Sequence, residues 1–149
     1  MKFKFSLASV LSHREVLERN AEIALGKEVQ KQVALEAELQ ALIDEYKGLV
    51  QTRGGINTKS AEGFEHYVSY ASRLKVLSSQ KKAEIDKQKQ EVEKARKELI
   101  KKTQEKKAIE VLRDSQKAAF KLAEKRMEAK QTDEAATQLL YSRDQQDDS

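Results

Sequence analysis

Apolar and polar positions in the first third of the chain alternate with the spacing of a coiled-coil helix. The positions follow one another in steps of four and three residues, and nine of the thirteen are apolar: Leu7, Leu11, Arg14, Glu18, Ala21, Leu25, Glu28, Gln32, Leu35, Leu39, Leu42, Tyr46 and Leu49. Because an α-helix repeats every ~3.6 residues, this alternation keeps one narrow stripe facing a partner helix. The pattern predicts a helix over residues 7–52.

A second, weaker stripe occupies the rest of the chain. Its apolar members are Tyr67, Ala71, Leu74, Ile85, Val92, Ala95, Leu99, Ile109, Phe120, Ala123, Met127 and Tyr141, and the positions between them are polar. Residues 61–141 are therefore predicted to form a second helix, and the polar residues 142–149 a disordered tail.

The break between the two stripes lies around Gly54 and Gly55, because glycine readily adopts the left-handed conformation that ends a helix. We expect a loop over residues 53–60. Ser60 or a neighbouring residue would start the second helix, and Ser6 would cap the first. The sequence thus predicts an all-α fold, a single antiparallel two-helix coiled-coil hairpin over residues 1–149 with the longer helix at the C-terminal side.

The two predicted helices differ in length. At ~1.5 Å per residue they span about 70 Å and about 120 Å, so about thirty residues of the second helix have no partner in the hairpin. Five large apolar residues lie there: Phe120, Leu122, Met127, Leu139 and Leu140. Exposed apolar stripes usually mark binding surfaces. The alternative is a contact with a second copy of the chain or a frayed end.

Four polar residues interrupt the first stripe, namely Arg14, Glu18, Glu28 and Gln32. Polar residues in a seam can fix the register of two helices, because a slipped pairing would leave them without partners. The simpler explanation is a loose coil in which these side chains reach out to water.

Composition supports long helices and not a globular core. Charged residues make up 36% of the 149 residues and aromatic residues 5%, with no Pro, Cys or Trp. A Pro inside a helix costs ~3 kcal/mol, so its absence fits an unbroken helix. The lack of Cys excludes disulfides and thiolate metal sites.

No catalytic constellation is present in the sequence. His13 and His66 stand alone, and neither a metal-binding helix motif nor a glycine-rich phosphate loop occurs. A two-helix coil also has no interior for a pocket. We expect no enzyme activity, no cofactor and no metal.

The net charge is +4, and eleven basic residues face six acidic ones between Lys81 and Lys107. Pairs such as Glu98 and Lys102, four residues apart, indicate a solvated helix face and not a nucleic-acid groove, which usually carries aromatic residues for stacking. The sequence shows no signal peptide and no apolar stretch of ~20 residues. We therefore expect a cytoplasmic protein that does not insert into the membrane.

Three blocks of the sequence resemble the flagellar FliJ family. They are residues 3–11 (FKFSLASVL), residues 105–112 (EKKAIEVL), and residues 123–130 (AEKRMEAK) followed by Asp133 and Glu134. The resemblance covers nearly the whole chain. It implies a small coiled-coil component of the bacterial flagellar type III export apparatus, similar to the central stalk of rotary ATP synthases.

The resemblance also implies partners. They are the hexameric export ATPase, the cytoplasmic domain of the export-gate membrane protein and export chaperones, at the inner membrane of the flagellar base. The expected ATPase contact comprises Phe3, Phe5, Leu7, Phe120, Met127, Lys130, Asp133 and Glu134. The expected gate contact comprises Leu42, Leu49, Tyr70, Leu74 and Leu77, of which Leu42, Leu49 and Leu74 lie on the stripes and are equally well explained as core.

Three other functions compete with the flagellar one. The stalk of a virulence injectisome shares the layout, although the opening Phe-Lys-Phe favours the flagellar system. A generic coiled-coil tether predicts self-association at micromolar concentration. A basic nucleic-acid-binding rod predicts a steep dependence of DNA binding on salt.

Overall fold

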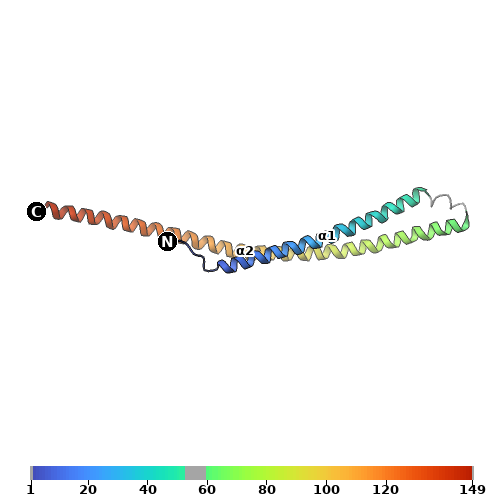
Figure 1. Ribbon diagram of the computed structural model, residues 1–149, viewed down its shortest axis with the longest axis horizontal. Helices are drawn as coiled ribbons and strands as arrows, with labels where there is room; N and C mark the ends of the chain where they lie inside the picture. Colours follow the sequence, from blue (N-terminus) through green and yellow to red (C-terminus); the bar gives the residue numbers. More distant parts are fainter. Residues whose placement is uncertain (1, 53–59, 149) are drawn as a thin grey trace. The chain divides into compact units, whose positions relative to one another are not determined.

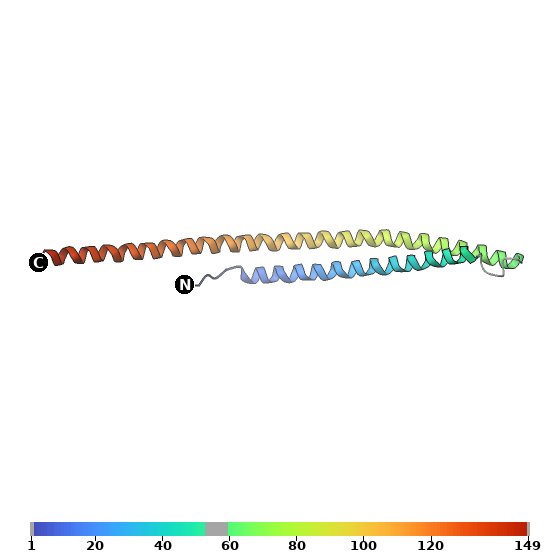
Figure 2. The ribbon, with the colours of Figure 1, turned by 90° about the horizontal axis from the view of Figure 1, so that it is seen from above.

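The computed structural model describes residues 2–52 and 60–148. Its two elements are α1 (Ala8–Thr52, 45 residues) and α2 (Ala61–Asp147, 87 residues), drawn in Figures 1 and 2, and the described residues include no strand. The predicted all-α fold with a longer second helix is confirmed. The predicted turn at Gly54 and Gly55 lies outside the described residues.

Ser60 caps α2 as predicted. Its carbonyl oxygen accepts a hydrogen bond from the backbone N–H of Phe64 at 3.0 Å, and its hydroxyl oxygen accepts one from Gly63 at 3.0 Å. These bonds satisfy amide groups that have no partner inside the helix. Glu62 adds a negative charge to this first turn, where the helix dipole favours it.

α1 ends at Thr52, at the predicted position, whereas its start and the end of α2 differ from the predicted ones by one and six residues. α1 begins at Ala8, after a turn in which Phe5 accepts a hydrogen bond from Ala8, so Leu7 and not Ser6 provides the first helical carbonyl. α2 continues to Asp147 and includes most of the tail expected to be disordered. Residues 142–147 contain neither Gly nor Pro, and polarity alone costs a helix less than ~1 kcal/mol per residue.

The chain divides into two compact units, and the first to consider is Leu17–Thr103. In this unit α1 and α2 run antiparallel and lie side by side (Figures 1 and 2). The cross-helix contacts show the direction: as the residue number rises along α1, the number of its partner in α2 falls. Glu28 thus meets Gln88, whereas Glu38 meets Lys81. The buried residues of this unit, Leu74, Ile85 and Val92, all belong to the α2 stripe.

The second unit comprises Met1–Val16 and Gln104–Ser149. Here the first turns of α1 pack against α2, with Leu11 buried and Arg14 paired to Glu105 at 2.7 Å. Beyond Phe120, every described residue of α2 is exposed.

The predicted stripes agree with the burial along both helices. Leu11 is buried and the other twelve positions of the first stripe are half-buried. The second stripe is covered from Tyr67 to Phe120, but Ala123, Met127 and Tyr141 are exposed, because the α1 segment of their unit has ended. The gaps in the second stripe are filled by half-buried polar residues: Ser78, Lys81, Gln88, Lys102, Lys106 and Arg113.

Two of the polar residues in the first stripe have partners on the facing helix. The Arg14 guanidinium donates to the Glu105 carboxylate, and the Gln88 amide donates to both the carboxylate and the backbone carbonyl of Glu28, at 2.6 and 2.9 Å. Gln32 bonds within α1, to Glu36. For Arg14 and Glu28 the contacts favour register control over the simpler expectation of side chains reaching out to water.

Candidate partner-binding surfaces

The expected gate-contact residues divide into buried and exposed members. Leu74 is 3% exposed, and Leu42 and Leu49 are half-buried. Tyr70 and Leu77, which fall off the stripe, are 39% and 38% exposed. Tyr70 and Leu77 are therefore accessible to a partner, whereas Leu74 is not.

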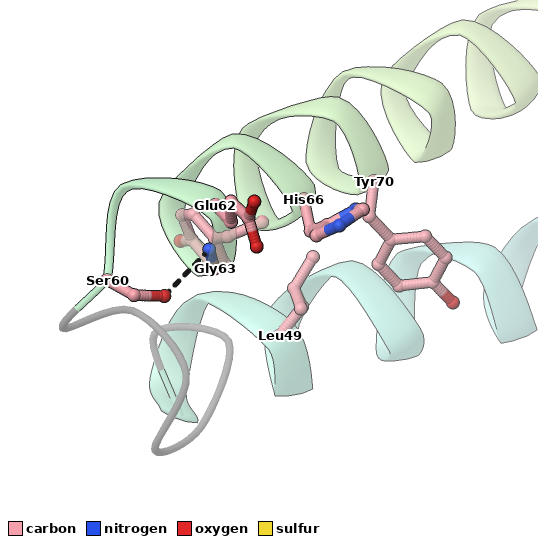
Figure 3. Close-up of a pocket in the computed structure, with 7 residues that line it drawn as sticks. Leu49, Ser60, Glu62, Gly63, His66 and Tyr70 are labelled. Atoms are coloured by element: carbon pink, nitrogen blue, oxygen red, sulfur yellow. Dashed lines mark hydrogen bonds between the residues drawn. The ribbon is translucent and has the colours of Figure 1, made fainter.

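An open hollow lies beside Tyr70 at the start of α2. It is lined by Leu49 of α1 and by residues of the first turns of α2: Ser60, Glu62, Gly63, His66, Tyr67 and Tyr70. Figure 3 shows the Leu49 side chain directed toward His66 and Tyr70 on the facing helix. Its lining combines the apolar side chain of Leu49 and two tyrosine rings with the polar side chains of Ser60, Glu62 and His66.

Polar contacts orient two aromatic rings of this unit. The Tyr70 hydroxyl donates a hydrogen bond to the Glu45 carboxylate, across the two helices. The Lys75 ammonium lies 5.5 Å from the centre of the Tyr46 ring, a cation–π geometry. Glu45 thus fixes the hydroxyl end of the one tyrosine in the expected gate contact, and that tyrosine stays 39% exposed.

At the other expected surface, the N-terminal arm contacts α2. The rings of Phe3 and Phe120 lie 5.6 Å apart at 50°, the tilted arrangement that aromatic pairs prefer. Phe5 and Leu7 are half-buried in the same unit. The structure therefore brings together Phe3 and Phe120, two residues of the expected ATPase contact.

The remaining members of the expected ATPase contact are exposed on α2 alone. Met127 is 57% exposed. Lys130, Asp133 and Glu134 line a shallow hollow together with Arg126 on the same helix. These four residues of the expected contact extend the surface that begins at Phe120, and no described residue covers them.

Two polar groups of the seam have shifted pKa values. Lys81 is hydrogen-bonded to Glu38 at 2.7 Å and to Glu84 at 3.2 Å, and these bonds, the one to Glu38 first, raise the pKa of Lys81. The hydrogen bond from Gln88 lowers the pKa of Glu28, with a smaller contribution from Lys31. Both shifts favour the charged form, as expected when a charged group gains a hydrogen-bond partner.

The described residues offer little for catalysis or metal binding. No group of three or more His, Asp or Glu residues among them could hold a metal ion. None of the described helix segments is apolar and long enough to span a bilayer.

The Glu98–Lys102 pair expected on the basic segment forms, at 3.5 Å, and other pairs there follow a three-residue spacing.

Comparison with known families decides the identity of the chain. The model of the flagellar FliJ protein family matches residues 3–145, nearly its full length. This chain belongs to the FliJ family. Comparisons with curated proteins and with solved structures returned no match.

Membership of the FliJ family makes the chain a component of the flagellar type III export apparatus, associated with other components of that apparatus. The expected resemblance is thereby confirmed.

Sequence reasoning missed the cross-helix polar contacts of this FliJ chain. Lys81, which joins Glu38 to Glu84, and Gln88, which binds Glu28, fall in the gaps of the second apolar stripe. Continuing the steps of three and four through those gaps would have placed both residues in the seam.

Proposed function

We propose that this FliJ protein is a non-enzymatic, central-stalk-like component that binds the export ATPase ring and the export gate. In this role it promotes assembly and activity of the ATPase and export of flagellar proteins, while ATP hydrolysis belongs to the ring. The family match over residues 3–145 carries the proposal. We further propose that it acts in the cytoplasm, peripherally at the inner membrane, and meets export chaperones there.

The contact with the ATPase is assigned to the surface formed by the Phe3–Phe120 ring pair and the exposed residues that follow it on α2. Phe5 and Leu7 support the arm, and Met127, Lys130, Asp133 and Glu134 extend the contact. An apolar centre with charged residues around it is the usual composition of a protein–protein interface.

The contact with the gate is assigned to Tyr70 and Leu77, with Leu42 and Leu49 at the edge of the seam and Leu74 beneath them. Exposure of Tyr70 and Leu77 supports this assignment, as does the neighbouring hollow in Figure 3. Tyrosine is among the residues that most often dominate the energy of such contacts.

The ATPase assay tests the proposal. Addition of the chain to its cognate export ATPase, at one copy per hexamer, is expected to raise the rate of ATP hydrolysis or the fraction of intact rings. Met127→Glu is expected to lower that stimulation about tenfold, because it places a charge in the apolar part of the contact.

Val111→Glu is the matched control, since Val111 is also exposed on α2 but lies outside the proposed contact. Absence of any stimulation with both proteins folded would refute the proposed role. Stimulation lost equally in both variants would move the contact away from Met127.

A further inference from the structure

The part of α2 beyond Phe120 carries an exposed stripe whose order of residues is self-complementary. Steps of three and four residues place on one face Ala119, Leu122, Arg126, Ala129, Asp133, Ala136 and Leu140. All seven are exposed, Leu122 to 50% and Leu140 to 62%. Within the described residues, neither Arg126 nor the Asp133 carboxylate has an ion-pair partner.

The charge along this segment changes sign at its middle. Residues 117–130 contain five basic and two acidic side chains, whereas residues 131–148 contain one basic and five acidic side chains. In a second segment of the same sequence laid antiparallel, Lys125 and Arg126 of one copy can therefore face Glu134 and Asp133 of the other.

We propose that two copies of this chain associate through this stripe, as antiparallel helices related by a two-fold axis between Ala129 and Lys130. In that register Arg126 of each copy lies opposite Asp133 of the other, and Leu140 lies opposite Ala119, within one turn of Leu122. Alanines in the middle let the two backbones approach closely, while the leucines bury apolar surface at both ends.

The symmetry of the stripe favours a second copy over a different partner. For charged residues to attract each other across a two-fold axis, opposite signs must lie at equal distances on either side of its midpoint, as Arg126 and Asp133 do. An unrelated protein imposes no such requirement. Three heptads bury little area, so the dissociation constant is expected on the order of 10 µM.

The self-association stripe adjoins the proposed ATPase contact and shares one residue with it, Asp133. Phe120, Met127, Lys130 and Glu134 follow a neighbouring stripe of the same helix. Self-association and ATPase binding are therefore expected to compete.

Charge exchange between two variants tests the proposal. Sedimentation velocity of the full chain at 1–200 µM is expected to show dimers for the wild type and at least a tenfold weaker association for Arg126→Glu and for Asp133→Arg. An equimolar mixture of the two variants is expected to restore dimers. In the mixed dimer the glutamate introduced at position 126 of one chain faces the arginine introduced at position 133 of the other, and the native Asp133 and Arg126 form the second contact.

Matched controls are Lys121→Glu and Glu128→Arg, which make the same changes of charge on another face of the same segment. Both are expected to dimerise like the wild type. Circular dichroism checks that every variant keeps its helix content.

The relative orientation of the two copies can be determined by disulfide cross-linking of introduced cysteines. The chain contains no cysteine of its own, so each variant carries a single one. A mixture of Arg126→Cys and Asp133→Cys chains is expected to cross-link as a heterodimer far faster than either chain with itself. Homodimeric cross-linking at position 126 alone would overturn the antiparallel arrangement.

Three results would overturn the proposal of self-association. They are a wild type that stays monomeric to 200 µM, single variants that still dimerise, and a mixture that stays monomeric. If the wild type is monomeric and Arg126→Glu lowers affinity for the export ATPase, the stripe belongs to the ATPase contact instead.

Discussion

At the scale of single residues, the seam relies on a few polar contacts whose partners lie far apart in the sequence. Arg14 with Glu105 and Glu28 with Gln88 join the two helices in different units. A slip of one residue would move each of these groups away from its partner on the facing helix and break both contacts. The contacts therefore select one register where apolar residues are sparse.

The pH dependence of stability follows from Glu28. Because Gln88 lowers its folded-state pKa below the usual 4.5, Glu28 stabilises the fold above that pH, and its contribution is lost as the pH falls through the lowered value. Glu28→Gln is expected to show a smaller fall in melting temperature between pH 7 and pH 3 than the wild type.

Thermal melts followed by circular dichroism measure this difference. Glu22→Gln, an exposed position of the same helix, serves as control and is expected to lose as much stability on acidification as the wild type. Equal falls for Glu28→Gln and the wild type would show that the bond to Gln88 has no effect on the titration.

At the scale of the helices, the spacing of apolar residues predicted most of the structure, because the residues that pack between the two helices must recur with that spacing. Each position of the first stripe is covered, and the second stripe holds as long as α1 residues lie opposite it. The end of α2 could not be predicted, since residues 142–147 carry no residue that stops a helix. Nor could Leu74 be assigned to seam or surface until its 3% exposure was known.

Two isoleucines of α2 separate the effect of the seam from that of helix propensity. Ile85 is 5% exposed and Ile100 is 50% exposed. Ile85→Ala is expected to lower the free energy of unfolding by about 2–4 kcal/mol, because it leaves a cavity in the seam. Ile100→Ala, the same change outside the seam, is expected to cost less than ~0.5 kcal/mol.

Urea denaturation followed by circular dichroism measures both free energies of unfolding. The two variants are expected to share one m-value, the slope of the free energy against urea concentration. Similar losses for the two variants would mean that α1 does not cover Ile85 in solution.

At the scale of the whole molecule, α2 passes from a stretch that has a partner to one that has none. Leu74 to Leu99 contribute buried or half-buried residues in every turn, whereas residues 121–148 contribute none. A single helix in water gains little from propensity alone, so its stability depends on what packs against it. The different lengths of the two stripes already indicated this difference in the sequence. The order of charges beyond Phe120 suggests self-association only once the structure shows that this face is exposed.

Hydrogen exchange measures this difference directly. At 1 µM chain, amides of residues 121–147 are expected to exchange about 100-fold or more faster than those of residues 74–99, because an unpartnered helix opens locally. At 200 µM the exchange of residues 121–147 is expected to slow, if two copies cover each other there. Uniform protection along α2 at the low concentration would contradict the assignment of an unpartnered segment.

The pairing of Phe3 with Phe120 has a practical consequence for experiments on the intact chain. An aromatic pair is worth about 0.5–1.5 kcal/mol beyond its burial, which thermal energy overcomes often. A bulky affinity label joined just before Phe3 would lie close to Phe120 and displace the Phe3 ring from its contact with Phe120. Binding measurements that depend on this end of the molecule should therefore carry any label elsewhere, and an untagged sample is the appropriate reference.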